Sequence, residues 1–112
     1  MNILIIEDET AAAVNLQSIL KKVAPSYNIL AILESIEESV EYFSNKSNIY
    51  PDLVFMDIHL ADGESFHIFD KVEITAPIVF TTAYDEYALR AFKVNSIDYI
   101  LKPIKEEDLR HA

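Results

Sequence analysis

The sequence has 112 residues and no cysteine, and 51% of its residues are hydrophobic. This size and composition predict one globular domain, 1–112, and exclude a disulfide framework and thiolate metal sites. The net charge of −10 argues against direct nucleic-acid binding, because phosphate contacts need clustered Lys and Arg. No apolar run approaches the roughly 18 residues of a membrane span, and the residues after Met1 lack the basic region and cleavage site of a signal peptide, so none is expected. We therefore expect a cytoplasmic protein without membrane contact.

Strand-like and helix-like patterns alternate along the first half of the chain. Residues 3–6 (ILII) form a continuous apolar run, typical of a strand buried on both faces. A helical apolar stripe follows, and Pro25 ends it. A second apolar run covers 29–33. Residues 35–38 (SIEE) then have the form of a capping box. The stripe of the first predicted helix consists of Ala12, Leu16, Ile19, Leu20 and Val23, and that of the second consists of Ile36, Val40 and Phe43.

The alternation continues through the second half. Further strands are predicted at 53–56, ending at Asp57, and at 77–81 and 99–101. The loop 58–63 contains the only glycine of the chain. Residues 105–112 have the pattern of a helix that has just begun, so we expect the last helix to be truncated. The third predicted helix is short and is marked by Phe66, Phe69 and Val72, and the fourth is marked by Ala88, Ala91 and Phe92.

Five short strands that alternate with helices predict an α/β domain with a doubly wound, five-stranded parallel sheet. Right-handed crossovers restrict the possible strand orders, and the flavodoxin-like (βα)5 order 2-1-3-4-5 is the natural choice. In that order the first and third strands are neighbours. Side chains that follow these two strands should therefore meet at the carboxyl edge of the sheet, where open α/β sheets bind ligands.

Carboxylates follow both of these strands. Glu7 and Asp8 come directly after the first, and Asp57 ends the third. Two such charges about 4 Å apart repel by roughly 4 kcal/mol at an effective dielectric of 20, so a cation or a shifted pKa is needed. Since only oxygen ligands are on offer, Mg²⁺ fits best.

Thr82 and Lys102 complete the set of polar strand ends. A threonine hydroxyl and a lysine ammonium group can both contact the oxygens of a transferring phosphoryl group. One of the carboxylates would then be the nucleophile and form an aspartyl phosphate. Asp57 is the best candidate, because it stands alone at the tip of a central strand.

These strand-end motifs closely resemble the receiver domain of two-component response regulators. The motifs are Glu7-Asp8, Asp57, Thr82-Ala83 and Lys102-Pro103, and the resemblance covers the whole chain. The stretch TAYDEYALRAFKVNSIDYILKPI, residues 82–104, is similar in particular to the LytTR class. Regulators of that class carry a LytTR-type DNA-binding domain after the receiver. The resemblance thus implies an output domain that is absent from this chain.

The resemblance implies a phosphorylation switch and not an enzyme. Asp57 would accept a phosphoryl group from a sensor histidine kinase in a Mg²⁺-dependent reaction. The metal ligands would be Glu7, Asp8, Asp57 and the main-chain carbonyl of His59. Phosphorylation would favour a homodimer through the face of helix four and strand five, and DNA would be bound only by the absent domain. Phosphoryl-binding or switch roles fall on Thr82, Ala83, Tyr99 and Lys102, and Pro103 would follow a cis peptide bond.

Simpler explanations exist for each motif taken alone. The pair Glu7-Asp8 could merely favour a helix N-terminus, Thr82 could be a helix cap, and Tyr99 could be a core aromatic. Glu9 and Asp62 are interpreted as solvated rim. Ala61 stands where many receivers have proline, which leaves the geometry of the acceptor loop open.

Three other functions compete with the switch. A haloacid-dehalogenase-like phosphatase would need an aspartate at the position of His59. A flavodoxin-type flavin carrier would need a Ser/Thr/Gly-rich phosphate loop where Glu7-Asp8-Glu9 stands. A constitutive interaction module that has lost phosphorylation would usually lack the acceptor or the acidic pair, and both are present here.

Overall fold

The computed structural model describes residues 1–83, 96–102 and 104–107. The predicted fourth helix and Pro103 lie outside these residues. The elements in chain order are β1 (Asn2–Ile6), α1 (Thr10–Val23), β2 (Asn28–Leu33), α2 (Ile36–Ser44), β3 (Leu53–Asp57), β4 (His59–Leu60), β5 (Gly63–Glu64), the 3-10 helix η1 (Ser65–Asp70), β6 (Ile78–Thr82) and β7 (Ser96–Leu101).

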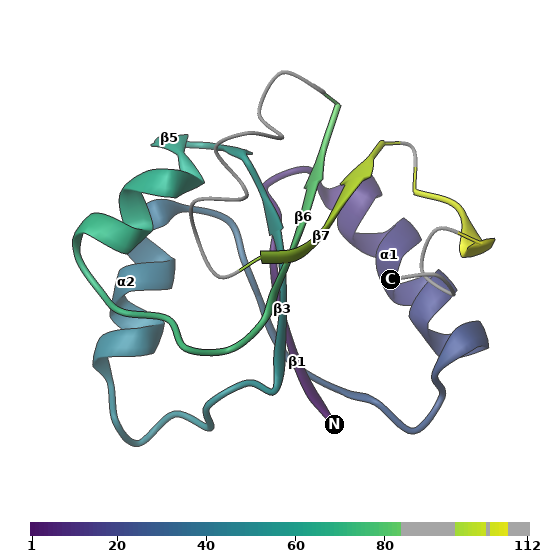
Figure 1. Cartoon of the computed structure of the whole chain (residues 1–112), viewed down its shortest axis with the longest axis horizontal. Coiled ribbons are helices and arrows are strands. Elements are labelled where there is room, and N and C mark those ends of the chain that lie inside the picture. The colour runs from purple at the N-terminus through teal and green to yellow at the C-terminus, as the bar shows by residue number, and fades with distance from the viewer. Residues whose placement is uncertain (84–95, 103, 108–112) are drawn as a thin grey trace.

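The main sheet has five strands in the order β2-β1-β3-β6-β7. All four strand pairs are parallel, so the predicted fold class and the order 2-1-3-4-5 are confirmed. The carboxyl ends of the strands lie at one edge of the sheet, at the top of Figure 1, opposite the N-terminus. In the register of neighbouring strands Ile6 pairs with Met56, and Asp57 pairs with Thr81. The chain segments that follow β1, β3 and β6 therefore emerge side by side.

Helices cover both faces of the sheet, which explains the continuous apolar run of β1. Figure 1 shows α1 on one side and α2 with η1 on the other. Ile3 and Ile5 belong to the core under α1, whereas Leu4 and Ile6 belong to the core under α2 and η1. All four side chains are fully buried. A strand whose side chains alternate between two cores needs apolar residues at every position.

Several details differ from the sequence prediction. Ala13, not Ala12, is the buried alanine of α1. The short third helix is the 3-10 helix η1, and the predicted loop 58–63 contains the β4–β5 hairpin, in which His59 pairs with Glu64.

Ser35 caps α2 as predicted, since its Oγ accepts from the N–H of Glu38 at 3.0 Å. The other half of the capping box shifts by one residue, because the Glu38 carboxylate accepts from the N–H of Glu34.

Within the part of the chain that the structure describes, none of the helices combines the length and the hydropathy that a membrane crossing requires.

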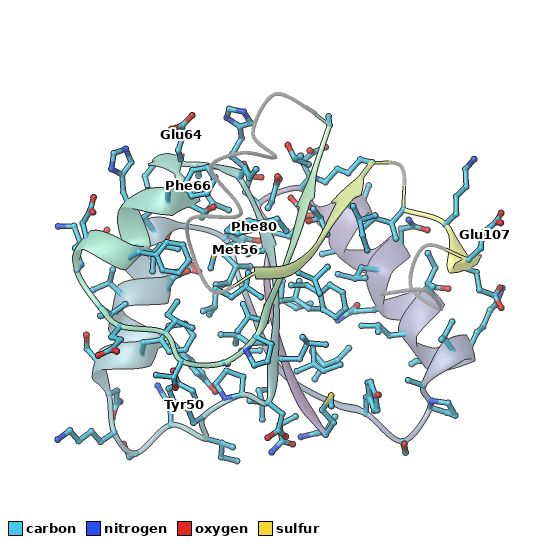
Figure 2. All side chains as sticks on the ribbon, in the orientation of Figure 1. Tyr50, Met56, Glu64, Phe66, Phe80 and Glu107 are labelled. Atoms are coloured by element: carbon cyan, nitrogen blue, oxygen red, sulfur yellow. The ribbon has the colours of Figure 1, made fainter. Side chains whose placement is uncertain are left out.

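Among the residues that the structure describes, Phe80 is the largest fully buried side chain, and it packs β6 against η1. Its ring centroid lies 5.3 Å from that of Phe66 and 6.5 Å from that of Phe69. Figure 2 shows Phe80, Phe66 and Met56 in the core on the α2 and η1 side of the sheet. We predict that Phe80→Ala lowers the free energy of unfolding by about 3–5 kcal/mol, because it removes a ring and leaves a cavity.

Urea denaturation followed by circular dichroism measures this loss. Val14→Ala is the control, because Val14 is 56% exposed on α1, and it should change stability by no more than about 0.5 kcal/mol. Phe80→Leu, which keeps most of the volume, should lie between the two. Equal stabilities of Phe80→Ala and Val14→Ala would contradict the core assignment.

Candidate functional site

Acidic side chains converge at the carboxyl edge of the sheet. Glu7, Asp8 and Glu9 follow β1, and Asp57 ends the neighbouring strand β3. One carboxylate oxygen from each of these four residues lies within 4.8 Å of the others. Because β1 and β3 are parallel neighbours in register, chain positions separated by about 50 residues are brought into one cluster. Strand order alone predicts this convergence.

Lys102 lies among these carboxylates as their counter-ion. Its Nζ is 2.6 Å from Glu7 Oε1, 3.0 Å from Asp57 Oδ2 and 3.3 Å from Glu9 Oε1. The backbone N–H of Lys102 donates to the carbonyl of Thr82 at 2.7 Å, which fixes the residue to the end of β6. The side chains of Glu7 and Asp57 are only 5% exposed, whereas that of Glu9 is 68% exposed. The pairs with Glu7 and Asp57 are therefore less screened by solvent than the pair with Glu9.

Burial and the ion pairs change the proton affinities of Glu7 and Lys102. Burial, the hydrogen bond to Asp57 and the charge of Asp57 raise the pKa of Glu7 to about 7, although the bond from Lys102 opposes this. Burial acts to lower the pKa of Lys102, but its hydrogen bonds and charge interactions with Glu7 and Asp57 outweigh that effect and raise the pKa. Lys102 thus stays a cation, and Glu7 can hold a proton near neutral pH.

A cavity of about 210 Å³ opens beside the cluster. This space is large enough for a small anion with water around it. Thr82 at the end of β6 is fully buried from solvent. The cavity is lined by Asp8, Glu9, Asp57, His59, Thr82, Ala83 and Lys102.

The hairpin after β3 holds the backbone next to Asp57. The N–H of His59 points to Asp57 Oδ1 at 3.4 Å, and the N–H of Ser65 donates to the carbonyl of Ile58 at 2.7 Å.

Tyr99 lies in β7, where its backbone pairs with Phe80; its side chain and Pro103 fall outside the described part of the structure. The roles expected of Tyr99 and Pro103 therefore stay predictions.

The cluster fits a hard divalent cation. Its donors are carboxylate oxygens from Glu7, Asp8, Glu9 and Asp57, and His59 lines the adjacent cavity. No thiolate or paired histidine competes among the residues that the structure describes. Carboxylate oxygens together with water are the ligands that Mg²⁺ prefers.

Sequence reasoning missed the contacts of two acids that it assigned to a solvated rim. Glu9 is exposed but pairs with Lys102. Asp62 is exposed as well, but its two carboxylate oxygens accept from the backbone N–H groups of Ile36 and Glu37, at 2.7 and 3.1 Å. The dipeptide Asp62-Gly63 could have signalled a hairpin turn, but nothing in the sequence links that turn to a helix 25 residues earlier.

The raised pKa of Glu7 predicts a pH dependence of stability in metal-free protein. The pKa is about 7 in the folded state against an ordinary value of 4.5, so the folded state binds more protons between these values. The free energy of unfolding should therefore fall as the pH rises from about 4.5 to 7. Glu7→Gln cannot titrate, and its stability should fall less across the same window.

Urea denaturation in EDTA across this window measures the difference between the two proteins. Glu41→Gln, at an exposed position on α2, should follow the wild-type curve. Parallel curves for wild type and Glu7→Gln would show that Glu7 does not take up a proton on folding.

Comparison with known proteins identifies the family. The profile of the response regulator receiver domain matches residues 3–112. The chain is 43% identical over 112 residues to the sensory transduction protein LytT of Enterococcus faecalis, covering 97% of this chain and 45% of that protein. It is 35% identical over 115 residues to LytT of Bacillus subtilis, covering 100% of this chain and 46% of that protein. The chain thus spans less than half the length of these relatives.

Solved structures agree with the sequence comparison. The N-terminal domain of a response regulator/sensory box/GGDEF three-domain protein from Carboxydothermus hydrogenoformans superposes with a TM-score of 0.79 at 31% identity, covering 99% of this chain and 89% of that one. The response regulatory domain of protein mrkE from Klebsiella pneumoniae has a TM-score of 0.84 at 25% identity, covering 99% and 90%. This chain therefore belongs to the response regulator receiver domains of two-component signalling, which are phosphoacceptor switches and not true enzymes.

Proposed function

We propose that Asp57 is the phosphoacceptor of this receiver domain. The observation that supports it best is the position of Asp57 Oδ2, 3.0 Å from Lys102 Nζ, beside a cavity that Thr82 also lines. Membership of the family implies a cognate histidine kinase as the phosphoryl donor. A receiver domain needs a carboxylate nucleophile with cationic and hydroxyl groups around the incoming phosphoryl oxygens.

In the proposed reaction a carboxylate oxygen of Asp57 attacks the phosphorus of a phosphohistidine. The P–O bond to Asp57 forms as the P–N bond breaks, and the imidazole leaves and takes up a proton from solvent. Lys102 would neutralise the oxygens of the transferring group, and the Thr82 hydroxyl would donate to one of them. Ala83 leaves room in the cavity wall for this group.

Receiver domains bind Mg²⁺, and this chain has a matching acidic cluster. We assign the metal ligands to Glu7, Asp8, Asp57 and the main-chain carbonyl of His59. When bound, the ion would supply positive charge that offsets the phosphoryl and carboxylate charges.

The output of the switch lies partly outside this chain. Thr82 would shift toward the phosphoryl group, Tyr99 would follow, and the face of helix four and β7 would then favour a homodimer. Since the chain spans under half of its LytT relatives, we assign residues 1–112 to the receiver domain. A LytTR-type DNA-binding domain in the remainder would make the contacts to DNA.

The first test is phosphorylation with a small donor. Incubation with acetyl phosphate and Mg²⁺ should add one phosphoryl group to the intact mass of the wild-type protein, and the gain should disappear with hydroxylamine, which cleaves acyl phosphates. Asp57→Asn should gain nothing, because its amide cannot form the acyl phosphate.

Asp52→Asn is the matched control, because Asp52 precedes β3 at the opposite end of the strand from Asp57; it should be phosphorylated like the wild type. A folded wild-type protein that gains no mass would reject the proposed function. Equal gain in wild type and Asp57→Asn would move the acceptor to another residue.

Mg²⁺ binding can be tested without phosphorylation. Saturating Mg²⁺ should raise the melting temperature, because a ligand that binds only the folded state at 100 times its Kd adds about 2.7 kcal/mol of stability. Asp8→Asn should remove most of this shift, and Glu41→Gln on α2 should retain it. Differential scanning calorimetry over a Mg²⁺ series measures the effect. An unchanged shift in Asp8→Asn would exclude Asp8 as a ligand.

A further inference from the structure

The start of α2 is capped from a distant part of the chain. Ser35 provides a local cap, since its Oγ accepts from the N–H of Glu38. The N–H groups of Ile36 and Glu37, which have no partner within the helix, instead donate to the two carboxylate oxygens of Asp62 at 2.7 and 3.1 Å. One carboxylate from another element therefore holds the first two residues of the helix.

Asp62 lies at the tip of the hairpin that follows the proposed acceptor. In the β4–β5 hairpin Leu60 pairs with Gly63, so the turn consists of Ala61 and Asp62. At its base, the N–H of His59 points to Asp57 Oδ1 at 3.4 Å. A two-residue hairpin is short and stiff. Fixing its tip therefore restricts the position of its base.

Gly63 provides a second contact between the hairpin and α2, independent of the Asp62 carboxylate. Its φ of +137° is one that residues with a side chain rarely adopt. A Cβ atom at this position would lie 3.3 Å from Ile36 Cδ1. The backbone of the hairpin thus approaches the first turn of α2 closely, and only glycine permits this approach without strain.

The electrostatics of this contact favour an ionised Asp62. A carboxylate at a helix N-terminus is stabilised by the helix dipole and by the N–H groups that point at it. Desolvation acts to raise the pKa of Asp62, but the hydrogen bonds from the backbone N–H groups of Ile36, Glu37 and Asp62 itself together outweigh it and lower the pKa.

We propose that Asp62 is a positioning residue of the phosphorylation site. By tying the tip of the acceptor hairpin to α2, it fixes the backbone of His59 beside Asp57 and couples the metal and phosphoryl site to the first turn of α2. This inference rests on the proposed function and adds to it a specific route of coupling. The coupling is reciprocal, as any linkage between two sites must be.

The first arm of the test compares two ways of weakening the same helix terminus. Asp62→Ala removes the cap that comes from the hairpin, and Ser35→Ala removes the cap that belongs to the helix itself. We expect Asp62→Ala to raise the Mg²⁺ concentration for half-maximal phosphorylation by acetyl phosphate about fivefold, the lower end of typical coupling between sites. Ser35→Ala should stay within about twofold of the wild type, although it loses a cap. Asp62→Asn, which keeps one acceptor oxygen, should lie between them.

The second arm measures the reverse effect by amide hydrogen exchange. Addition of Mg²⁺ alone should slow exchange at the N–H groups of Ile36 and Glu37 in the wild type by a similar factor. The slowing should vanish in Asp62→Ala and be reduced in Asp62→Asn, which serves as the test variant if Asp62→Ala does not fold. The N–H of Glu38, bound to Ser35, is the internal reference and should respond less.

The outcomes separate this inference from the proposed function. If the wild type is not phosphorylated at all, the proposed function fails, and the Mg²⁺-dependent exchange still decides whether the coupling exists. If the wild type is phosphorylated but Asp62→Ala and Ser35→Ala behave alike in the first arm, and the Asp62 variants keep the wild-type slowing in the second, the positioning role of Asp62 is overturned. A purely structural cap would change stability without changing the response of Ile36 and Glu37 to Mg²⁺.

Discussion

The rest of the site depends on the charge balance around Lys102. Its single ammonium group contacts Glu7, Glu9 and Asp57, two of which are nearly excluded from solvent. At an effective dielectric of 20, carboxylates about 4 Å apart would repel by roughly 4 kcal/mol, and Lys102 together with the raised pKa of Glu7 offsets this repulsion. The cluster still contains more acids than one lysine can neutralise, which is the arrangement that the proposed Mg²⁺ site requires. A structural ion-pair network would be expected to balance its charges more closely.

The two hydrophobic cores fix the positions of the side chains in this cluster. Ile5 and Ile6, on opposite faces of β1, are each fully buried, so the strand cannot rotate or slip without exposing one core. The same holds for β3 and β6, whose inner residues are buried on both faces. Side chains at the ends of such strands have fixed positions, which is why Asp57 and Lys102, from separate segments, lie 3.0 Å apart beside a cavity that Thr82 also lines. The parallel topology collects the groups, and the packing keeps them in place.

The sequence predicted the parts of this arrangement that depend on strand order, and missed those that depend on loop geometry. Glu7, Asp57 and Lys102 were predictable because each follows a strand-like run, and the order 2-1-3-4-5 then brings them together. The pairing of Glu9 with Lys102 was not predictable. Glu9 directly precedes α1, and the local backbone at the start of the helix decides the direction of its carboxylate. The hydrogen bonds from the start of α2 to Asp62 were not predictable either, because no pattern in residues 61–63 indicates a contact with a distant helix. Strand ends follow from periodicity, whereas contacts between a loop and a helix follow from tertiary packing.

The same charge balance explains how an arriving phosphoryl group could be accommodated in the proposed reaction. The group would bring close to two negative charges to the cluster. Among the described residues, Lys102 is the one basic side chain that pairs with these acids. Two partners of Lys102, Glu9 and Glu7, can lose their contact with the lysine at low cost. Glu9 is exposed, so water can replace its contact with Lys102 at little cost, and Glu7 would have the proposed Mg²⁺ as its partner in place of Lys102. Asp57, the third partner, would itself carry the phosphoryl group. The lysine could therefore turn to the phosphoryl oxygens without leaving a buried carboxylate unpaired, and this ability to exchange partners is what distinguishes a switch from a static ion pair.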